Sequence, residues 1–212
     1  MILYNYRDKG GITLEINHII NKCKAGEKDA FRELFSIVEK KSFHTAFLIC
    51  HDHGLTEDIL QETYLDCFKH IHKLKDPAAF HSWFYKILIR NSWKLVKSHR
   101  KVRLTSLDDQ ELEPEKYFTG LDSIQENQVI NNELQFMLLK HIQKLSPKTR
   151  IPIVLYYFNE LSVEEISQIQ SCLTATVKSR LYYGRQQLKV CLKPYMNEDV
   201  SRSLLKQKEV HQ

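Results

Sequence analysis

The chain has 212 residues, of which 42% are hydrophobic and 27% are charged, and its formal net charge is +5. These values are ordinary for a globular protein and leave room for one domain or two small ones. No run of about 18 apolar residues exists, so the sequence argues against membrane insertion and predicts a cytoplasmic protein. The five cysteines are scattered without a CxxC pair, and we expect free thiols.

The fold is predicted to be all-α. Glycine and proline are scarce, at 6 and 5 residues, and no segment alternates β-branched with polar residues. Two basic segments, 86–103 and 177–193, lie on either side of the acidic segment 104–133. The acidic segment contains Pro114 and Gly120 and has little helical periodicity, which is typical of a linker.

We therefore predict two small helical domains joined by a flexible acidic linker, the C-terminal domain being a helix-turn-helix. The predicted boundaries follow the changes in charge and periodicity. They are 1–25 for an N-terminal extension and first helix, 26–103 for the first domain, 104–129 for the linker, 130–193 for the second domain and 194–212 for a C-terminal tail.

The segment 55–74 has the spacing of an amphipathic helix with a core stripe of Leu60, Tyr64, Cys67 and Ile71. Its opposite face combines two acidic residues four positions apart, which repel each other in an isolated helix, with a leucine. This face comprises Asp58, Gln61, Glu62, Leu65 and Lys69. Two interpretations stay open: a solvated face with one stray leucine, or a docking surface for a basic partner helix.

A second informative helix is predicted after Asp76, which can cap it, and Pro77, which can open it. A basic stripe follows along this helix, and aromatic residues lie beside its start. Basic and aromatic side chains together suit single-stranded nucleic acid, because bases stack on the rings and phosphates are neutralised. The alternative is that the aromatic residues all belong to the core, which is the commoner outcome for Trp and Phe.

The C-terminal part predicts a helix-turn-helix. A helix around 132–145 precedes one that begins at Ser146 and Pro147, in which Pro152 must lie near the first turn to avoid a kink. Ser162 and Glu165 have capping-box spacing, and the connection SCLTA leads into a basic helix. That helix has an apolar stripe and an opposite polar face, which lies either in solvent or in a DNA major groove. The stripe is Val177, Leu181, Gly184 and Leu188, and the polar face is Ser179, Tyr182, Tyr183 and Gln186.

No enzyme is predicted, and no cofactor. The sequence lacks a glycine-rich phosphate loop, a metalloprotease signature and a convincing pair of nucleophile and base. A zinc site would need two helices to bring together Cys50, His51, His53, Cys67, His70 and His72. Because this spacing matches no common zinc finger, we expect no metal there.

Four segments, taken in order, resemble the extracytoplasmic-function (ECF, group IV) RNA polymerase sigma factors of the sigma-70 family. They are GEKDAFRELF, EDILQETYLDCFKHI, FHSWFYKILIRN and the long segment that begins LSPKTRIPIVLYYFNELSVEEISQ. The resemblance covers roughly 25–103 and 130–192. It implies a promoter-specificity subunit whose partners are bacterial core RNA polymerase (the β′ clamp helices and the β flap), promoter DNA and an anti-sigma factor.

The resemblance also implies roles for particular residues. The helix bearing Asp58, Gln61, Glu62 and Leu65 matches the segment that binds core polymerase. The next helix matches the segment that melts and captures the −10 element, with candidates Phe80, His81, Trp83, Lys86, Arg90, Asn91 and Lys94. The last helix matches the −35 reader, with candidates Thr176, Lys178, Ser179, Arg180, Tyr182, Tyr183 and Arg185.

The sequence departs from the family pattern at three positions. Ser171 stands where the family commonly has glycine in the tight turn, which raises a question about the geometry of that turn, and Ala175 stands at another frequent glycine position. Tyr183 stands where arginine is common, which suggests a different base preference or one phosphate contact fewer.

The main alternative function is a helix-turn-helix transcriptional regulator that never becomes a polymerase subunit. A purely protein-binding helical adaptor would leave both basic segments without a role.

Overall fold

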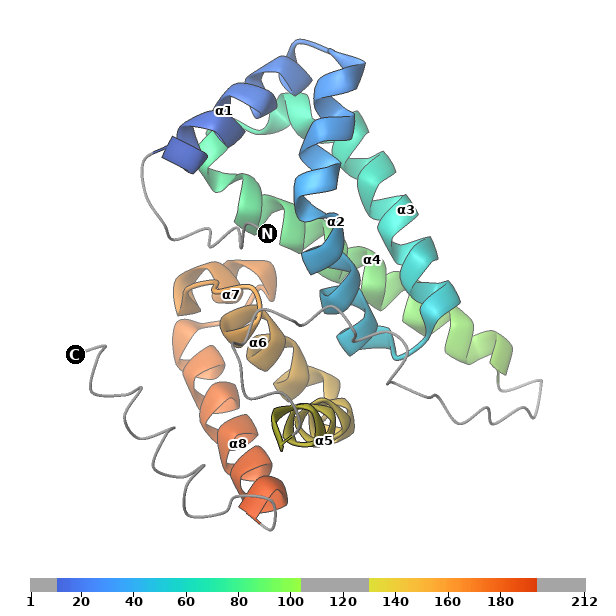
Figure 1. Cartoon of the computed structure of the whole chain (residues 1–212), viewed down its shortest axis with the longest axis vertical. Helices are drawn as coiled ribbons and strands as arrows, with labels where there is room; N and C mark the ends of the chain where they lie inside the picture. The colour runs from blue at the N-terminus through green and yellow to red at the C-terminus, as the bar shows by residue number, and fades with distance from the viewer. Residues whose placement is uncertain (1–10, 104–129, 194–212) are drawn as a thin grey trace.

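The computed structural model describes residues 11–103 and 130–193, within which all regular structure is helical (Figure 1). The first group of helices is α1 (Gly11–Lys24), α2 (Lys28–Cys50), α3 (His53–His70), η1 (Ile71–Lys73), η2 (Pro77–Ala79) and α4 (Phe80–Arg103). The second group is α5 (Ile130–Lys144), α6 (Pro147–Tyr157), α7 (Val163–Ile169) and α8 (Thr174–Leu192). The predicted all-α fold is confirmed. The predicted linker 104–129 and tail 194–212 lie outside the described residues.

The capping signals in the sequence set several helix starts. Ser162 and Glu165 form the predicted capping box: Glu165 N donates to Ser162 Oγ at 3.2 Å, and Ser162 N donates to the Glu165 carboxylate at 2.8 Å. The Asp76 carboxylate accepts from Ala78 N at 3.0 Å, as predicted for a cap. The turn that it caps is 3-10, however, and the α-helix itself begins only at Phe80.

Pro152 differs from its predicted place. α6 begins at Pro147, so Pro152 lies in the second turn of the helix rather than near the first. Because proline has no backbone N–H, the Lys148 carbonyl receives no helical hydrogen bond from position 152. The helix nevertheless continues to Tyr157.

The two groups of helices share one apolar core. α2 packs against α1, α3 and α4 of its own group and also against α5 and α6, while α4 packs against α7. Figure 1 shows the second group lying against α2 and α4, near the C-terminal end of α2. Buried residues from both groups, such as Leu34, Phe84, Ile142 and Ile151, belong to one continuous cluster.

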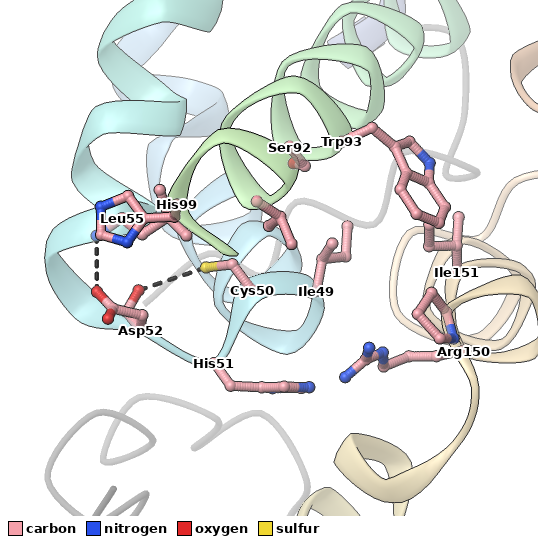
Figure 2. A pocket seen from close by; sticks show the side chains of 12 residues that line it. Ile49, Cys50, His51, Asp52, Leu55, Ser92, Trp93, His99, Arg150 and Ile151 are labelled. Carbon is pink, nitrogen blue, oxygen red and sulfur yellow. Dashed lines mark hydrogen bonds between the residues drawn. The ribbon is translucent and has the colours of Figure 1, made fainter. Parts of the chain in front are cut away.

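We call the contact of α2 and α4 with the second group the seam, and define it by Thr45, His51, Arg150 and Asn159. Asn159 Nδ2 donates to Thr45 Oγ1 at 2.8 Å, joining residues that are 114 positions apart. The His51 and Arg150 side chains point towards each other, and both line a cavity of about 260 Å³ together with Trp93 and other residues (Figure 2). Burial, reinforced by the Arg150 guanidinium, lowers the pKa of His51 to about 3, so its ring is neutral at pH 7.

At Gly184, α8 lies close to side chains of α6. A Cβ atom at this position would lie 2.8 Å from Ile153 Cγ1 and 2.9 Å from Thr149 Cγ2. Gly184→Ala should therefore lower the free energy of unfolding by about 1–3 kcal/mol, although alanine is the better helix former. Urea unfolding followed by circular dichroism measures the change.

Gly54→Ala in α3 is the matched control. Its nearest neighbour would be Asp52 Oδ1 at 3.6 Å, an ordinary contact. This substitution should raise the free energy of unfolding by up to about 1 kcal/mol through helix propensity. Equal stabilisation by both alanines would show that α6 and α8 do not approach closely at Gly184.

His51 should make stability depend on pH. Its folded-state pKa of about 3 lies below the ordinary value of 6.5, so the unfolded chain takes up the proton first as pH falls. The free energy of unfolding should fall below about pH 6.5, by up to about 1.4 kcal/mol per pH unit from this group. Urea unfolding at several pH values between about 7 and 5 measures the slope.

His51→Asn removes the titrating ring and suits the left-handed backbone at this position, where φ is 61°. The variant should show a smaller slope of stability against pH than the original chain. Part of the slope should persist, because burial also lowers the pKa values of His44 and His81. Identical slopes in the two proteins would contradict the assignment to His51.

Candidate nucleic-acid interface

The predicted docking face of α3 is largely exposed. Asp58 and Gln61 are in solvent, and the Leu65 side chain is 46% exposed. Phe68, which the sequence analysis did not single out, lies three residues further on and is 49% exposed, with its ring 4.6 Å from that of Phe31. The i, i+3 spacing of Leu65 and Phe68 was the signal that could have revealed it. The face therefore combines carboxylates with a larger apolar patch than predicted.

Acidic residues of α3 pair with the basic stripe of α4. The Arg90 guanidinium contacts the Asp66 carboxylate at 2.8 Å, and Lys94 Nζ contacts the Glu62 carboxylate at 3.3 Å. Burial works to raise the pKa of Asp66, but hydrogen bonds from Asn91 and Arg90 outweigh it and hold the pKa below its usual value. Two bases predicted to meet DNA are therefore already engaged, and Glu62 of the docking face is one of their partners.

The seven candidates on α4 are not presented alike. Lys86, Arg90 and Lys94 are exposed, and Trp83 is partly buried against the core. Phe80 and Asn91 are each only 2% exposed, which counts against direct DNA contact by either side chain. Phe80 packs in the aromatic core, and Asn91 Nδ2 donates to the Asp66 carboxylate at 3.1 Å. Both residues therefore contribute to the packing and orientation of their neighbours.

α4 also carries His81, one of the seven candidates, and Trp93. His81 is partly buried, and burial followed by the nearby Lys41 ammonium lowers its pKa to about 4. The exposed indole of Trp93, which the sequence analysis did not select, lines the seam cavity (Figure 2). Apart from Trp93, the exposed candidates for ligand contact on α4 are the basic residues Lys86, Arg90 and Lys94.

α7 and α8 form the predicted helix-turn-helix. Ile166 and Ile169 of α7 are buried, and so are Val177, Leu181 and Gly184 of α8, as the apolar stripe predicted. Ser171 in the turn has φ 49°, a left-handed conformation that glycine adopts more easily. The turn thus keeps the geometry for which the family often uses glycine, at the cost of some backbone strain.

The opposite face of α8 is a polar surface. Its exposed members are Lys178, Ser179, Tyr182, Tyr183 and Arg185, while Thr176 is partly buried. Arg180 is also partly buried, and its Nη1 donates to Gln170 Oε1 of the preceding turn at 3.0 Å. Arg180 therefore braces the two helices as well as bordering the surface. Arg185 Nη1 lies 3.4 Å from the Tyr157 hydroxyl, which adds α6 to the support of this face.

The cysteines and histidines do not assemble into a metal centre in the described part of the chain. No three His, Cys, Asp or Glu side chains among residues 11–103 and 130–193 are placed to hold a metal ion. Cys50 lies 3.1 Å from the Thr56 hydroxyl and Cys67 is fully buried. Among the described helices, none has both the length and the apolar character needed to cross a membrane.

Comparison with known proteins gives consistent matches. The family model described as "Sigma-70, region 4" matches residues 135–188, which contain the helix-turn-helix. The RNA polymerase sigma-H factor of Pseudomonas aeruginosa is 24% identical over 85% of this chain and 95% of its own. The ECF RNA polymerase sigma factor SigW of Bacillus subtilis is 28% identical over 80% of this chain and 92% of its own.

A solved structure shares the fold over both groups of helices. It is that of the sigma factor RpoE in complex with the anti-sigma factor NepR from Bartonella quintana, with a TM-score of 0.61 and 20% identity. The match covers 77% of this chain and 96% of that one. The region-4 match and the relatives aligned along most of their length make the chain similar to the extracytoplasmic-function sigma factors of the sigma-70 family, and the solved structure shows the shared fold.

Proposed function

We propose that the chain is a dissociable promoter-specificity subunit that binds bacterial core RNA polymerase, recognises −35 and −10 promoter elements and initiates transcription in the cytoplasm. The observation that carries the proposal is the region-4 match on a helix-turn-helix whose second helix exposes a basic, hydroxyl-rich face. Binding free energy, with no covalent step, would open the duplex. The chain would therefore act without being an enzyme.

α8 is the proposed −35 reader. Lys178 and Arg185 are exposed bases that suit guanine edges or phosphates, and Ser179 suits either. Tyr182 and Tyr183 offer ring edges to a thymine methyl and hydroxyls to phosphates. Arg180 is proposed mainly as a brace of the turn, because it already bonds to Gln170.

α3 is the proposed polymerase-docking helix. Its face of Asp58, Gln61, Glu62 and Leu65 offers carboxylates around an exposed apolar centre, to which Phe68 adds. Such a surface suits a basic, amphipathic helix pair such as the β′ clamp helices. Glu62 would exchange its contact with Lys94 for one with the partner, which would free Lys94 for DNA.

α4 is the proposed −10 helix, with Lys86, Arg90 and Lys94 towards the phosphates and the partly buried Trp83 as an aromatic residue beside the basic stripe. An anti-sigma factor is the proposed inhibitory partner, since a solved structure that shares the fold is a complex with one. A regulator that acts without polymerase is the weaker alternative, because it leaves the acidic and apolar face of α3 without a role. The names of the relatives, all RNA polymerase sigma factors, also favour the sigma factor.

In vitro transcription tests the proposal. Purified protein added to sigma-free bacterial core polymerase on a promoter library should give new transcript starts that share a two-part upstream motif. Asp58→Lys should abolish these starts and co-purification with core polymerase, because it places a cation on the acidic docking face. The fold should persist, since Asp58 is exposed.

Glu15→Lys on α1 makes the same charge reversal at another exposed site and should leave transcription unchanged. Co-purification of Asp58→Lys at the original level would remove α3 from the docking role. An absence of new starts with intact duplex binding would instead favour the conventional regulator.

Lys178→Ala should weaken binding to the −35 element without altering association with polymerase. If Lys178 contacts a phosphate, the slope of log binding constant against log salt should become shallower by about 1. Fluorescence anisotropy with the selected promoter duplex over a salt series measures both quantities. Lys28→Ala, which removes an exposed lysine of α2, should leave affinity and slope unchanged. Equal effects of the two substitutions would mean that the loss reflects net charge rather than a contact by α8.

A further inference from the structure

A cavity of about 260 Å³ lies where the end of α2 and the start of α3 meet α4 and α6 (Figure 2). Most of its wall is apolar, and the apolar lining residues are Ile49, Leu55, Trp93, Val96, Pro147 and Ile151. An apolar cavity of about 150 Å³ can hold benzene, so this one has room for a single aromatic ring with a small substituent. None of the lining residues belongs to the faces that we assign to polymerase or to DNA.

Several polar groups of the cavity wall already have hydrogen-bond partners. The Cys50 thiol lies 3.1 Å from the Thr56 hydroxyl, and the Ser92 hydroxyl donates to a backbone carbonyl of its own helix at 2.8 Å. Asp52 carries the only carboxylate among the described residues that line the cavity, and it accepts from Leu55 N at 2.8 Å. These three side chains therefore have little to gain from a ligand.

His51 is the exception among the lining residues. Both of its ring nitrogens are buried, and neither makes a hydrogen bond within the described part of the chain, although the Phe47 carbonyl is near. A neutral imidazole carries one N–H donor and one acceptor, so both capacities of this ring are unused. Buried polar groups without a partner are rare in folded proteins and call for an explanation such as a bound group. The His51 ring thus marks the polar end of the cavity.

Arg150 brings a positive charge to the same end. Its side chain points towards the His51 ring (Figure 2), and the residue is only 5% exposed. Nη1 donates to the Gln143 carbonyl at 3.0 Å, a bond that holds the guanidinium in place without neutralising its charge. Burial, followed by this guanidinium, keeps the pKa of His51 at about 3, so the ring is neutral and has one N–H to donate. A carboxylate is the small group that accepts hydrogen bonds from both side chains.

Trp93 supplies an aromatic part of the wall. Its indole comes from α4, and the residue is 45% exposed. A ring packed on this indole would remove apolar surface from water and could adopt a stacked or edge-to-face arrangement. Asp52 lies on the far side of the cavity from Arg150 (Figure 2) and so does not oppose an anion at the arginine.

We propose that the cavity is a binding site for a small aromatic monocarboxylate, whose carboxylate lies between Arg150 and His51 and whose ring packs on Trp93. Small rotations about the last torsions of Arg150 and His51 would bring their N–H groups onto the carboxylate oxygens. A ligand held by residues from four helices would stabilise the folded chain. The site stands apart from the proposed function, because it shares no residue with the polymerase or DNA faces.

Titration of the full chain with benzoate, followed by proton–nitrogen correlation NMR, tests the site. The chain has two tryptophans, so two indole N–H signals are expected, and Trp93→Phe assigns them. Benzoate should shift the Trp93 signal in a saturable way, with a dissociation constant of about 0.1–1 mM for a ligand of this size. The signal of Trp83, which does not line the cavity, should stay in place.

Two further probes separate the parts of the ligand. Benzamide keeps the ring and loses the charge, whereas acetate keeps the carboxylate and loses the ring. Each should bind at least about tenfold more weakly than benzoate, because each lacks one of the two interactions.

Variants test the polar end. Arg150→Gln should weaken benzoate binding at least about tenfold by removing the charge. His51→Gly removes the other donor at a position with φ 61°, which glycine adopts without strain, and should weaken binding about three- to tenfold. It also serves as the decisive variant if Arg150→Gln does not fold. Lys148→Ala is the matched control, since it removes an exposed cation of α6 that does not line the cavity, and it should leave the affinity unchanged.

Each alternative result contradicts a defined part of the proposal. No saturable shift of the Trp93 signal up to about 10 mM benzoate would overturn the site. Equal affinity for benzamide would overturn carboxylate recognition, and equal affinity for acetate would overturn the aromatic part. An unchanged affinity in His51→Gly would overturn the assigned polar end. None of these results bears on transcription with core polymerase, so they leave the proposed function to its own test.

Discussion

The apolar packing of α2 is the constraint on which the rest of the structure depends. Its first half, through Leu34 and Val38, is buried in the first group of helices, and its last turns contribute Phe47 and Leu48. The same helix contacts α5 and α6, so one continuous rod supports both groups. Closely packed interiors are rigid. Because α2 packs against both groups of helices, the packing of the first group also fixes the position of the second group, which contains the helix-turn-helix.

Charge pairing between α3 and α4 links the two proposed binding faces of the first group. Lys94 and Arg90 bond to Glu62 and Asp66, which screens part of the basic stripe while the chain is free. These pairs are partly exposed and should be individually weak, so a polymerase or DNA ligand can replace them at small cost. Docking on one face would thereby change the charge available on the other.

Backbone strain is concentrated at the connections that orient these helices. The non-glycine residues with positive φ in the described chain are His51, Glu160 and Ser171, and each lies just after a helix. His51 ends α2, Glu160 lies between α6 and α7, and Ser171 lies in the turn of the helix-turn-helix. Tight connections at these places are maintained by the buried helices on either side, which outweigh the local cost.

The sequence by itself determined the all-α fold, the capping box at Ser162 and Glu165 and the buried stripe of α8, because helical periodicity and capping are local. It also identified an acidic and apolar face on α3 and a polar face on α8. Only the tertiary structure decided that Phe80 and Asn91 are buried and that Arg180 braces the turn, because burial depends on which helices cover a face. The pairing of Thr45 with Asn159 was equally beyond local patterns, since two polar residues 114 positions apart carry no shared signal until the helices pack.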